Sequence, residues 1–410
     1  MAIIIIATCD HTATQATETS ILNGDMLESV IKFRRAFRTC LRSLRASLKG
    51  PERGKAKMKR VLASFSPEQH KMLSEDLKDC ARVYFRKKAF RRMKRAIINA
   101  QKSLDMQMFI WRADMTGRMV AELLVAAANR GVKIKIRKEI VGDVFEFADD
   151  FAATKNDSHH IWKSFWNHPN IEAHHENHHD HSKTFVVDDK LLLVSSMNIG
   201  DAYCNDWHEC LVELRGKRFV DEYRDGRADM PRMTQAGHIA VLRSSASEPM
   251  LPAVLSLIAS AKKSIRIEMA YFSDPQIVEL LAKKTREGVY VFLIIPHSPD
   301  VHHHSNLAAV AKLLNLAKKR RTFVFRYTRG LLHTKMIIVD RHTLFIGSTN
   351  LITSSLTKMG ETNVVIHRHP RRCLRVVRRQ FTKDVLQSVK LEAEEITSTV
   401  WQRFLTTLGL

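Results

Sequence analysis

The chain has 410 residues, of which 45% are hydrophobic and 27% are charged, and its formal net charge is +23 at pH 7. This composition excludes an intrinsically disordered protein, and the length suffices for two ordinary domains or one large one. The basic surplus favours a polyanionic partner, such as nucleic acid, an anionic membrane surface or a phosphate-bearing substrate, over a merely solvated surface.

Residues 1–80 form a basic extension ahead of the first repeated segment. The opening stretch "MAIIIIATCDH" has an apolar run too short to span a bilayer, and it lacks the basic start of a secretion signal. Residues 26–49 carry apolar side chains at helical spacing between many lysines and arginines, which predicts a basic amphipathic helix. We expect this helix either to lie on an anionic membrane or to pack on the next domain with its charges solvated.

Cysteine usage and hydropathy bear on where the protein works. The six cysteines include no C-x-x-C pair, which favours reduced thiols and a cytosolic protein. No window of the sequence approaches 18 uninterrupted apolar residues, so we expect any membrane contact to be peripheral.

The chain repeats its own pattern of elements. The stretch "AIINAQKSLDMQMFIW" at 96–111 predicts a helix that leads into a strand, and "LIASAKKSIRIEMAYF" at 257–272 predicts the same pair. A second helix and strand follow each, with Gly131 and Gly288 placed to end these helices. We therefore predict a basic helical extension at 1–80, two similar domains at 81–235 and 236–380, and a C-terminal helix at 381–410.

A set of polar residues recurs at identical spacing in the two halves. "HSKTFVVDDKLLLVSSMN" begins at His181, and "HTKMIIVDRHTLFIGSTN" begins at His333. A purely structural duplication would mainly preserve the apolar pattern, so repetition of these residue types indicates repeated chemistry. The recurring residues are His181, Lys183, Asp188, Ser196, Asn198 and Glu209 in the first copy and His333, Lys335, Asp340, Ser348, Asn350 and Glu361 in the second.

Side-chain direction divides these residues into two groups. Because side chains alternate along a strand, His181 and Lys183 share a face, whereas Asp188 has the opposite parity and falls at a turn. The second copy divides in the same way, so we expect Asp188 and Asp340 to be scaffold residues. A hairpin return would bring the serine and asparagine of each copy beside its histidine and lysine.

An imidazole, an ammonium, an amide and a hydroxyl at one place suit a phosphate ester. Lysine and asparagine can stabilise charge on a five-coordinate phosphorus. One neutral histidine can attack the phosphorus, while a second, protonated histidine donates to the leaving oxygen, and a carboxylate can fix each imidazole. The expected phosphate-binding residues are Lys183, Ser196, Asn198, Lys335, Ser348 and Asn350. The expected catalytic residues are His181, Lys183, Asn198, Glu209, His333, Lys335, Asn350 and Glu361.

A histidine-rich stretch, "HHENHHDH", ends at His181. Taken alone it indicates a metal site, with helical i, i+4 pairs such as His174 and His178 as ligands. The matching segment of the second copy has only His333, so the repeated chemistry needs only His181, and we expect no metal and no other cofactor. The other histidines at 174–179, and those at 302–304, either line the entrance to the site or are solvated.

The pattern H-x-K-x4-D, followed by G-S-x-N, resembles the phospholipase D superfamily. The second copy matches in full, and the first has Ser195 where the family usually has Gly. "MNIGDAY" and "GSTNL" are similar to bacterial-type cardiolipin synthases. The resemblance implies an α/β fold of two similar lobes, each a mixed sheet flanked by helices, related by a pseudo-twofold with one active site between them. It also implies metal-independent phosphatidyl transfer through a phosphohistidine at His181, with His333 as acid and base.

Three other functions remain open from the sequence. A phospholipase D hydrolase, including a secreted effector, would use the same residues with water as acceptor. A nuclease of the superfamily would use them on nucleic acid, although the sequence has no interleaved aromatic and basic residues for base stacking. A catalytically inactive binding protein is disfavoured by two intact motifs. We expect a cytoplasmic, peripherally membrane-associated monomer that acts on anionic glycerophospholipids.

Overall fold

The computed structural model describes residues 81–142, 167–231 and 238–392. The chain divides into two compact units, Met1–Lys78 and Asp79–Leu410, and the described residues belong to the second. The amphipathic helix expected at 26–49 therefore lies outside the described residues. Within those residues, no helix combines the length and the apolarity needed to cross a membrane.

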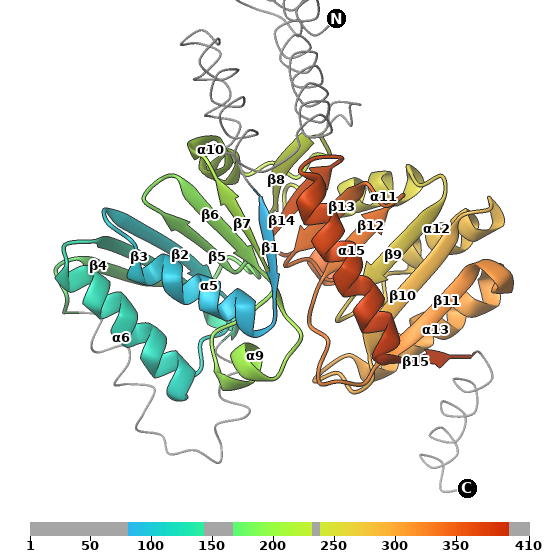
Figure 1. Ribbon diagram of the computed structural model, residues 1–410, viewed down its shortest axis with the longest axis horizontal. Helices are drawn as coiled ribbons and strands as arrows, with labels where there is room; N and C mark the ends of the chain where they lie inside the picture. The colour runs from blue at the N-terminus through green and yellow to red at the C-terminus, as the bar shows by residue number, and fades with distance from the viewer. Residues whose placement is uncertain (1–80, 143–166, 232–237, 393–410) are drawn as a thin grey trace, which may run out of the picture. The chain divides into compact units, whose positions relative to one another are not determined.

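The first lobe is built on a mixed sheet (Figure 1). Strands β2, β3 and β4 pair in parallel, and the remaining pairs are antiparallel. Among the described residues the spatial order is β1 (Arg82–Phe85), β7 (Cys210–Arg215), β6 (Leu191–Ser195), β5 (Thr184–Val187), β2 (Ser103–Met108), β3 (Lys133–Glu139) and β4 (Ile171–Glu176).

The second lobe repeats this topology and adds one edge strand. Strands β9, β10 and β11 pair in parallel, as β2, β3 and β4 do in the first lobe. The order among the described residues is β8 (His238–Ser244), β14 (Glu361–His367), β13 (Thr343–Gly347), β12 (Met336–Val339), β9 (Ser264–Glu268), β10 (Tyr290–Pro296), β11 (Thr322–Tyr327) and β15 (Ser388–Leu391). The predicted fold of two similar mixed-sheet lobes is confirmed.

Helices pack on both faces of each sheet, and their ends follow local sequence signals. Helix α6 (Met115–Asn129) starts at Asp114, whose carboxylate accepts the Gly117 N–H at 2.9 Å, and Gly131 follows its end at φ 91°. Gly288 follows helix α12 (Pro275–Arg286) at φ 98°, so both predicted helix ends are confirmed. The other helices are α5 (Lys87–Ile98), α9 (Asp201–Asn205), α10 (Lys217–Asp225), α11 (Leu251–Ala259), α13 (His303–Leu316), the 3₁₀ turn η1 (Lys319–Arg321), α14 (Thr353–Thr357) and α15 (Arg371–Leu386).

An apolar core joins the two lobes. The inner faces of both sheets contribute to it, with Val194 and Val212 from the first lobe and Ile338 and Ile346 from the second. Helix α15 of the second lobe also reaches the first lobe, since the Cys373 Sγ lies 2.5 Å from the Ala81 carbonyl oxygen. Burial of these apolar faces fixes the lobes together, so side chains from both can form one rigid site.

The C-terminal part of the chain differs from the single helix expected at 381–410. Helix α15 ends at Leu386, and Ser388–Leu391 form β15, which pairs antiparallel with β11. The apolar residues of this segment lie along an edge strand and not on one face of a helix. Apolar periodicity read over the whole of 381–410 favours a helix and hides this short strand. Residues 393–410 lie outside the described residues.

Candidate active site

The two motif histidines lie at the seam between the lobes, each just ahead of a hairpin strand. His181 precedes β5 and His333 precedes β12. The His181 N–H donates to the Gly360 carbonyl at 2.7 Å, and the His333 N–H donates to the His208 carbonyl at 3.0 Å. Each histidine is therefore held by the backbone that directly precedes the repeated glutamate of the other pair, Glu361 for His181 and Glu209 for His333.

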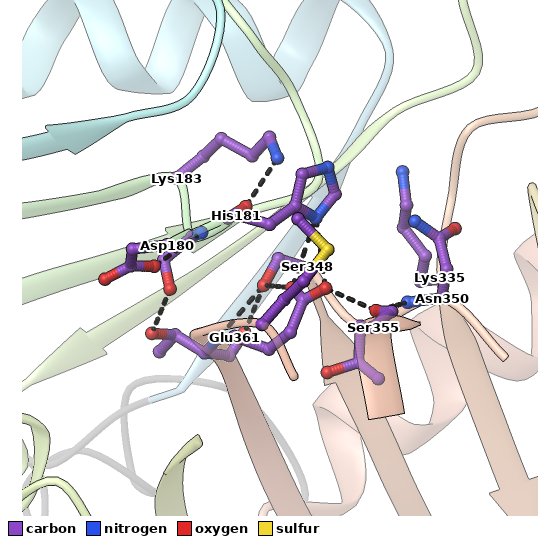
Figure 2. Close-up of polar contacts among 12 residues, drawn as sticks. Asp180, His181, Lys183, Lys335, Ser348, Asn350, Ser355 and Glu361 are labelled. Carbon is purple, nitrogen blue, oxygen red and sulfur yellow. Dashed lines mark hydrogen bonds and ion pairs between the residues drawn. The ribbon is translucent and has the colours of Figure 1, made fainter. Parts of the chain in front are cut away.

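The histidine and glutamate side chains pair across the seam. His181 Nδ1 lies 3.1 Å from Glu361 Oε1, and His333 Nδ1 lies 2.7 Å from Glu209 Oε1. Both glutamates are fully buried, and Figure 2 shows the His181 ring over the Glu361 carboxylate. With Nδ1 bound to a carboxylate, Nε2 of each ring is left for a substrate.

Burial and charge set the protonation of these pairs. Burial raises the pKa of Glu361, but the charges of His181 and Lys183 and hydrogen bonds from His181 and Ser348 outweigh it, so the pKa is lowered overall. Glu209 is lowered in pKa for the same reasons, through His333 and Lys335. Burial, together with the charge of Lys183, lowers the pKa of His181 to about 4, and burial also lowers the pKa of His333. Near neutral pH the site therefore holds carboxylates beside largely neutral imidazoles.

Two buried lysines lie in the same site. Lys183 Nζ donates to the His181 carbonyl at 2.5 Å, and Lys335 Nζ donates to the His333 carbonyl at 2.8 Å. Burial lowers the pKa of Lys183 to about 7 and that of Lys335 to about 8, against the attraction of the glutamates. Buried ammonium groups attract an anion, because its charge offsets part of the cost of burying theirs.

The asparagines lie close to this charge centre. The Ile110 N–H donates to Asn198 Oδ1 at 3.2 Å, which leaves the amide NH₂ of Asn198 for a ligand. Figure 2 shows Asn350 beside Lys335, and the buried Oδ1 of Asn350 has no hydrogen-bond partner among the described residues.

The structure gives the two motif serines a different place from the one expected. The Ser196 hydroxyl donates to Glu209 Oε2 and accepts the Cys210 N–H at 2.9 Å. The Ser348 hydroxyl likewise donates to Glu361 Oε2 and accepts the Thr362 N–H at 3.0 Å. These hydroxyls hold the glutamates in place, and in this arrangement their protons are directed to the carboxylates.

Asp188 and Asp340 lie away from the histidines, at turns. The Asp188 carboxylate accepts the N–H groups of residues 101–103, with the shortest contact at 2.7 Å from Lys102. Asp340 does the same for residues 262–264, with 2.7 Å to Lys263. Each aspartate thus ties its hairpin to the start of the central strand β2 or β9, a scaffold position.

The one difference between the motif copies has a local cause. A Cβ on Gly347 would lie 2.2 Å from the Thr362 carbonyl oxygen, so the second lobe has no room for a side chain there. In the first lobe the Ser195 hydroxyl donates to the Cys210 carbonyl at 2.9 Å and accepts the Met197 N–H at 3.0 Å. Ser195 therefore closes a backbone turn, and its hydroxyl is not available to a phosphate.

Sequence comparison of the copies missed residues that occur on one side only. Ser355 donates to Glu361 Oε1, whereas the matching position of the first copy is Tyr203, close to His333. Aromatic rings also line the histidines: Phe109 packs edge-on to His181 at 4.7 Å between centroids, and Trp207 packs against His333 at 5.0 Å. A search for conserved spacing discards such residues because the other copy has something else there.

The additional histidines do not join the two histidine–glutamate pairs. His174 and His175 lie on strand β4, which rules out the helical i, i+4 pair with His178, and His174 Nε2 contacts Glu172 Oε1 at 2.5 Å in solvent. His302 differs, since its ring packs 4.9 Å from that of Tyr271 near His333.

A separate buried cluster lies beneath α15. His208 Nε2 is 3.0 Å from Asp384 Oδ2, and Glu268 is in reach of the same point. Among the described residues this is the one set of three potential ligands that could converge on a metal ion. Burial and the neighbouring Asp384 raise the pKa of Glu268 well above its usual value, which favours a protonated carboxyl group there.

Known proteins resemble this chain in sequence. The family described as "Cardiolipin synthase, PLD-like domain" matches residues 93–227 and 254–385, once in each lobe and together more than half of the chain. A cardiolipin synthase of Clostridium perfringens strain 13 is 24% identical over 355 residues, covering 76% of this chain and 71% of the relative. Cardiolipin synthase B of Escherichia coli K12 is 27% identical over 312 residues, covering 68% and 75%.

Solved structures share the fold. The phosphatidylserine synthase of Haemophilus influenzae Rd KW20 superposes with a TM-score of 0.60 at 13% identity, covering 80% of this chain and 93% of that one. At that identity the similarity concerns the arrangement of the two lobes alone.

Proposed function

The chain belongs to the family of cardiolipin synthase-type, phospholipase D-like proteins and is an enzyme of the phospholipase D superfamily, and from this premise we propose that it is a phosphatidyltransferase of the cardiolipin synthase type. It transfers the phosphatidyl group of an anionic glycerophospholipid to an alcohol through a covalent phosphohistidine. The resemblance recognised from the two motifs is confirmed by the family match, whereas the acceptor and the intermediate belong to the proposal.

The crossed histidine–glutamate pairs carry this proposal. Each lobe supplies the imidazole of one pair and the carboxylate of the other, so neither lobe alone has an oriented histidine. Two buried lysines face the same space and favour a bound phosphate diester over bulk water. One chain therefore completes one site, which supports a functional monomer.

The proposed reaction assigns opposite roles to the two histidines. His181 is neutral because burial and Lys183 lower its pKa to about 4, so its Nε2 has a free electron pair to attack the phosphorus. The bond from phosphorus to the leaving alcohol breaks as His333, protonated at Nε2, gives its proton to the leaving oxygen. Lys183, Lys335, Asn198 and Asn350 stabilise the charge that develops on the non-bridging oxygens.

The second half of the reaction reverses the proton transfer. Neutral His333 takes the proton of the entering hydroxyl, the alcohol oxygen attacks phosphorus, and the bond from phosphorus to His181 Nε2 breaks. The products are the new phosphodiester and the original state of both histidines. Glu361 and Glu209 support the positive charge that appears first on one ring and then on the other.

Lipid substrates of this kind lie in a membrane, so we infer that the enzyme works at a membrane surface as a peripheral protein. The net charge of +23 supports attraction to an anionic bilayer. The curated relatives named above are synthases, which gives the alternative of a secreted effector no support.

Incubation with labelled phosphatidylglycerol, with and without added glycerol, tests the proposal. We expect cardiolipin and glycerol from phosphatidylglycerol alone, and reversal of the reaction as glycerol is added. Phosphatidic acid as the sole product would identify a hydrolase instead, and cleavage of plasmid DNA in a parallel reaction with no lipid product would identify a nuclease. A His181→Ala variant is the control for contaminating activity.

A further inference from the structure

The two sides of the site differ in polarity, although the catalytic residues are repeated. On the His181 side the nearest ring is Phe109, whose counterpart in the second lobe is Ala270. On the His333 side, Tyr271 occupies the position that Ile110 has in the first lobe, and its ring centroid is 6.0 Å from that of His333. The ring of Phe109 beside His181 is apolar, whereas the ring of Tyr271 beside His333 carries a hydroxyl.

Tyr271 connects the catalytic centre to an exposed carboxylate. Its hydroxyl donates to Asp300 Oδ1 at 2.6 Å, while the Tyr271 ring itself is only 7% exposed. Burial raises the pKa of Tyr271 well above its usual value, and the charge of Asp300 adds to this, so the hydroxyl remains a donor. The charge of Asp300 also acts to raise the pKa of His333 and of Lys335, which places the carboxylate within electrostatic reach of both.

The chemistry of the transfer determines what this side must bind. In an in-line displacement the leaving oxygen departs opposite the attacking nitrogen, so an alcohol released after attack by His181 leaves on the His333 side. The acceptor alcohol enters at the same place, because His333 must take its proton. This side therefore binds the exchanged alcohol in both half-reactions.

A carboxylate at this position selects among possible headgroups. It repels a phosphate and accepts hydrogen bonds from hydroxyls. A cationic headgroup could also pair with it, but the Arg112 guanidinium already lies 5.5 Å from the Tyr203 ring centroid, and Lys335 is close to His333. Those cations oppose an ammonium group and leave an uncharged polyol as the favoured ligand.

We propose that Asp300, positioned by Tyr271, binds the hydroxyl groups of the exchanged alcohol, and that this alcohol is an uncharged polyol such as a glycerol unit. This assignment rests on the proposed phosphatidyl transfer and specifies its acceptor. Asp300 is a binding residue for the acceptor, and Tyr271 is a positioning residue that acts through it.

The test uses a phosphatidyl donor with which formation of the phosphohistidine can be measured separately from binding of the acceptor alcohol. The 4-nitrophenyl ester of a short-chain phosphatidic acid releases nitrophenolate without help from an acid, so the burst of nitrophenolate reports attack by His181. Glycerol then competes with water for the intermediate, and the ratio of phosphatidylglycerol to phosphatidic acid gives the apparent KM for glycerol.

We expect Asp300→Asn to raise the KM for glycerol about tenfold or more, since a hydrogen bond to a charged group is lost, while the burst stays as in the parent enzyme. Tyr271→Phe keeps the ring and should raise this KM by a smaller factor. Asp225→Asn, an exposed aspartate on α10, is the charge-matched control and should change neither quantity.

Several outcomes would overturn the assignment. These are an unchanged glycerol KM in Asp300→Asn, a burst slowed as much as the transfer, and a parent enzyme that prefers ethanolamine or choline to glycerol in a manner that depends on Asp300. Absence of a His181-dependent burst would instead reject the proposed function. In that case saturation-transfer NMR with glycerol on the parent enzyme and Asp300→Asn still decides whether the subsite exists, because binding requires no turnover.

Discussion

The two lobes share their strand order and six polar residues, but the groups around those residues differ. Glu361 is held by Ser348 and Ser355, whereas Glu209 has Ser196 and faces a site lined by Tyr203 and Trp207. The duplicated frame supplies two similar histidines, and their unequal surroundings supply the asymmetry that nucleophilic and acid–base roles require.

A second difference lies on the inner faces of the sheets. Helix α10 ends at Asp225 and leaves an open cavity of about 460 Å³ lined by charged groups such as Asp105, Arg137 and Arg243. The longer helix α15 of the second lobe supplies Asp384 to a buried cluster with Glu268 and with His208 of the first lobe. The inner faces of the sheets therefore hold an open charged cavity in one place and a sealed cluster of titratable groups in another.

Removal of either motif histidine should cause the largest loss of transfer activity. We expect His181→Ala and His333→Ala each to lose about 10⁴-fold in transfer from phosphatidylglycerol. With the 4-nitrophenyl donor, His333→Ala should keep a burst, because nitrophenolate needs no proton, and His181→Ala should have none. His174→Ala, an exposed histidine on β4, is the control. A burst in His181→Ala and none in His333→Ala would reverse the assignment of roles.

The crossed pairs predict that glutamate substitutions act on the other lobe's histidine. Glu361→Gln should reduce the nitrophenolate burst by roughly 10² to 10⁴-fold through His181, by analogy with loss of a triad carboxylate. Glu209→Gln should spare the burst and slow transfer to and from alcohols, because it supports His333. Equal effects of both variants on both steps would contradict the crossed arrangement.

Substitution of a buried lysine should lower activity but raise stability. Lys183→Met removes an ammonium from the site and should lower kcat by roughly 10²-fold. Because burial lowers the pKa of Lys183 to about 7, the unfolded chain binds its proton more tightly than the folded chain does. Below about pH 7 the buried lysine therefore lowers the free energy of unfolding by its full amount. This destabilisation decreases as the pH rises and disappears above the ordinary lysine pKa of 10.5.

A thermal scan of Lys183→Met checks this sign. The Tm should rise by a few degrees at pH 7, and the gain should shrink as the pH approaches 10. Lys190→Met, a solvent-exposed lysine of the same hairpin, should change neither activity nor Tm. A lower Tm for Lys183→Met at pH 7 would mean that its ammonium stabilises the folded site.

In the pH profile of kcat/KM, His181 should set the acid limb and His333 the alkaline limb. His181 must be neutral, and its pKa of about 4 places the acid limb of kcat/KM well below the 6.5 of an ordinary histidine. His333 must be protonated, and because burial lowers its pKa the alkaline limb lies below 6.5. We expect an optimum between these limits for kcat/KM, and a kcat optimum at higher pH, since a bound phosphate anion raises the pKa of His333. An acid limb near 6.5 would show that His181 is not desolvated.

The position that differs between the motifs gives the smallest expected effect on activity. Ser195→Gly should remain active and lose about 1 kcal/mol of unfolding free energy with the serine hydrogen bonds. Gly347→Ser should lose about 3 kcal/mol or more, because the added Cβ meets the Thr362 carbonyl. Denaturant unfolding of both variants measures this contrast, and similar losses would refute the steric explanation.

The repeated residues were the part of the site that the sequence revealed well. Spacing alone singled out His181 and Glu361, and the parity of Asp188 placed it at a turn, because strand alternation is a local property. The spacing of the repeated residues could not show that His181 pairs with Glu361 instead of Glu209, since pairing across the seam depends on how the two sheets pack.

Features found in one lobe only escaped prediction for a related reason. Ser355 and Tyr271 match Tyr203 and Ile110 in the first copy, so the comparison of copies carried no signal for them. The serine hydroxyls were expected at the phosphate because the motif places Ser196 beside Asn198, but the buried glutamates require donors and take them first.

Locating the covalent phosphatidyl group tests the central claim most directly. The enzyme would be mixed with a short-chain labelled phosphatidylglycerol, quenched in alkali where a phosphoramidate survives, digested and sequenced by mass spectrometry. We predict a modified His181 in the parent enzyme and in Glu209→Gln, with no modification in His181→Ala. A phosphatidyl group on His333, or turnover with neither histidine modified, would contradict the account.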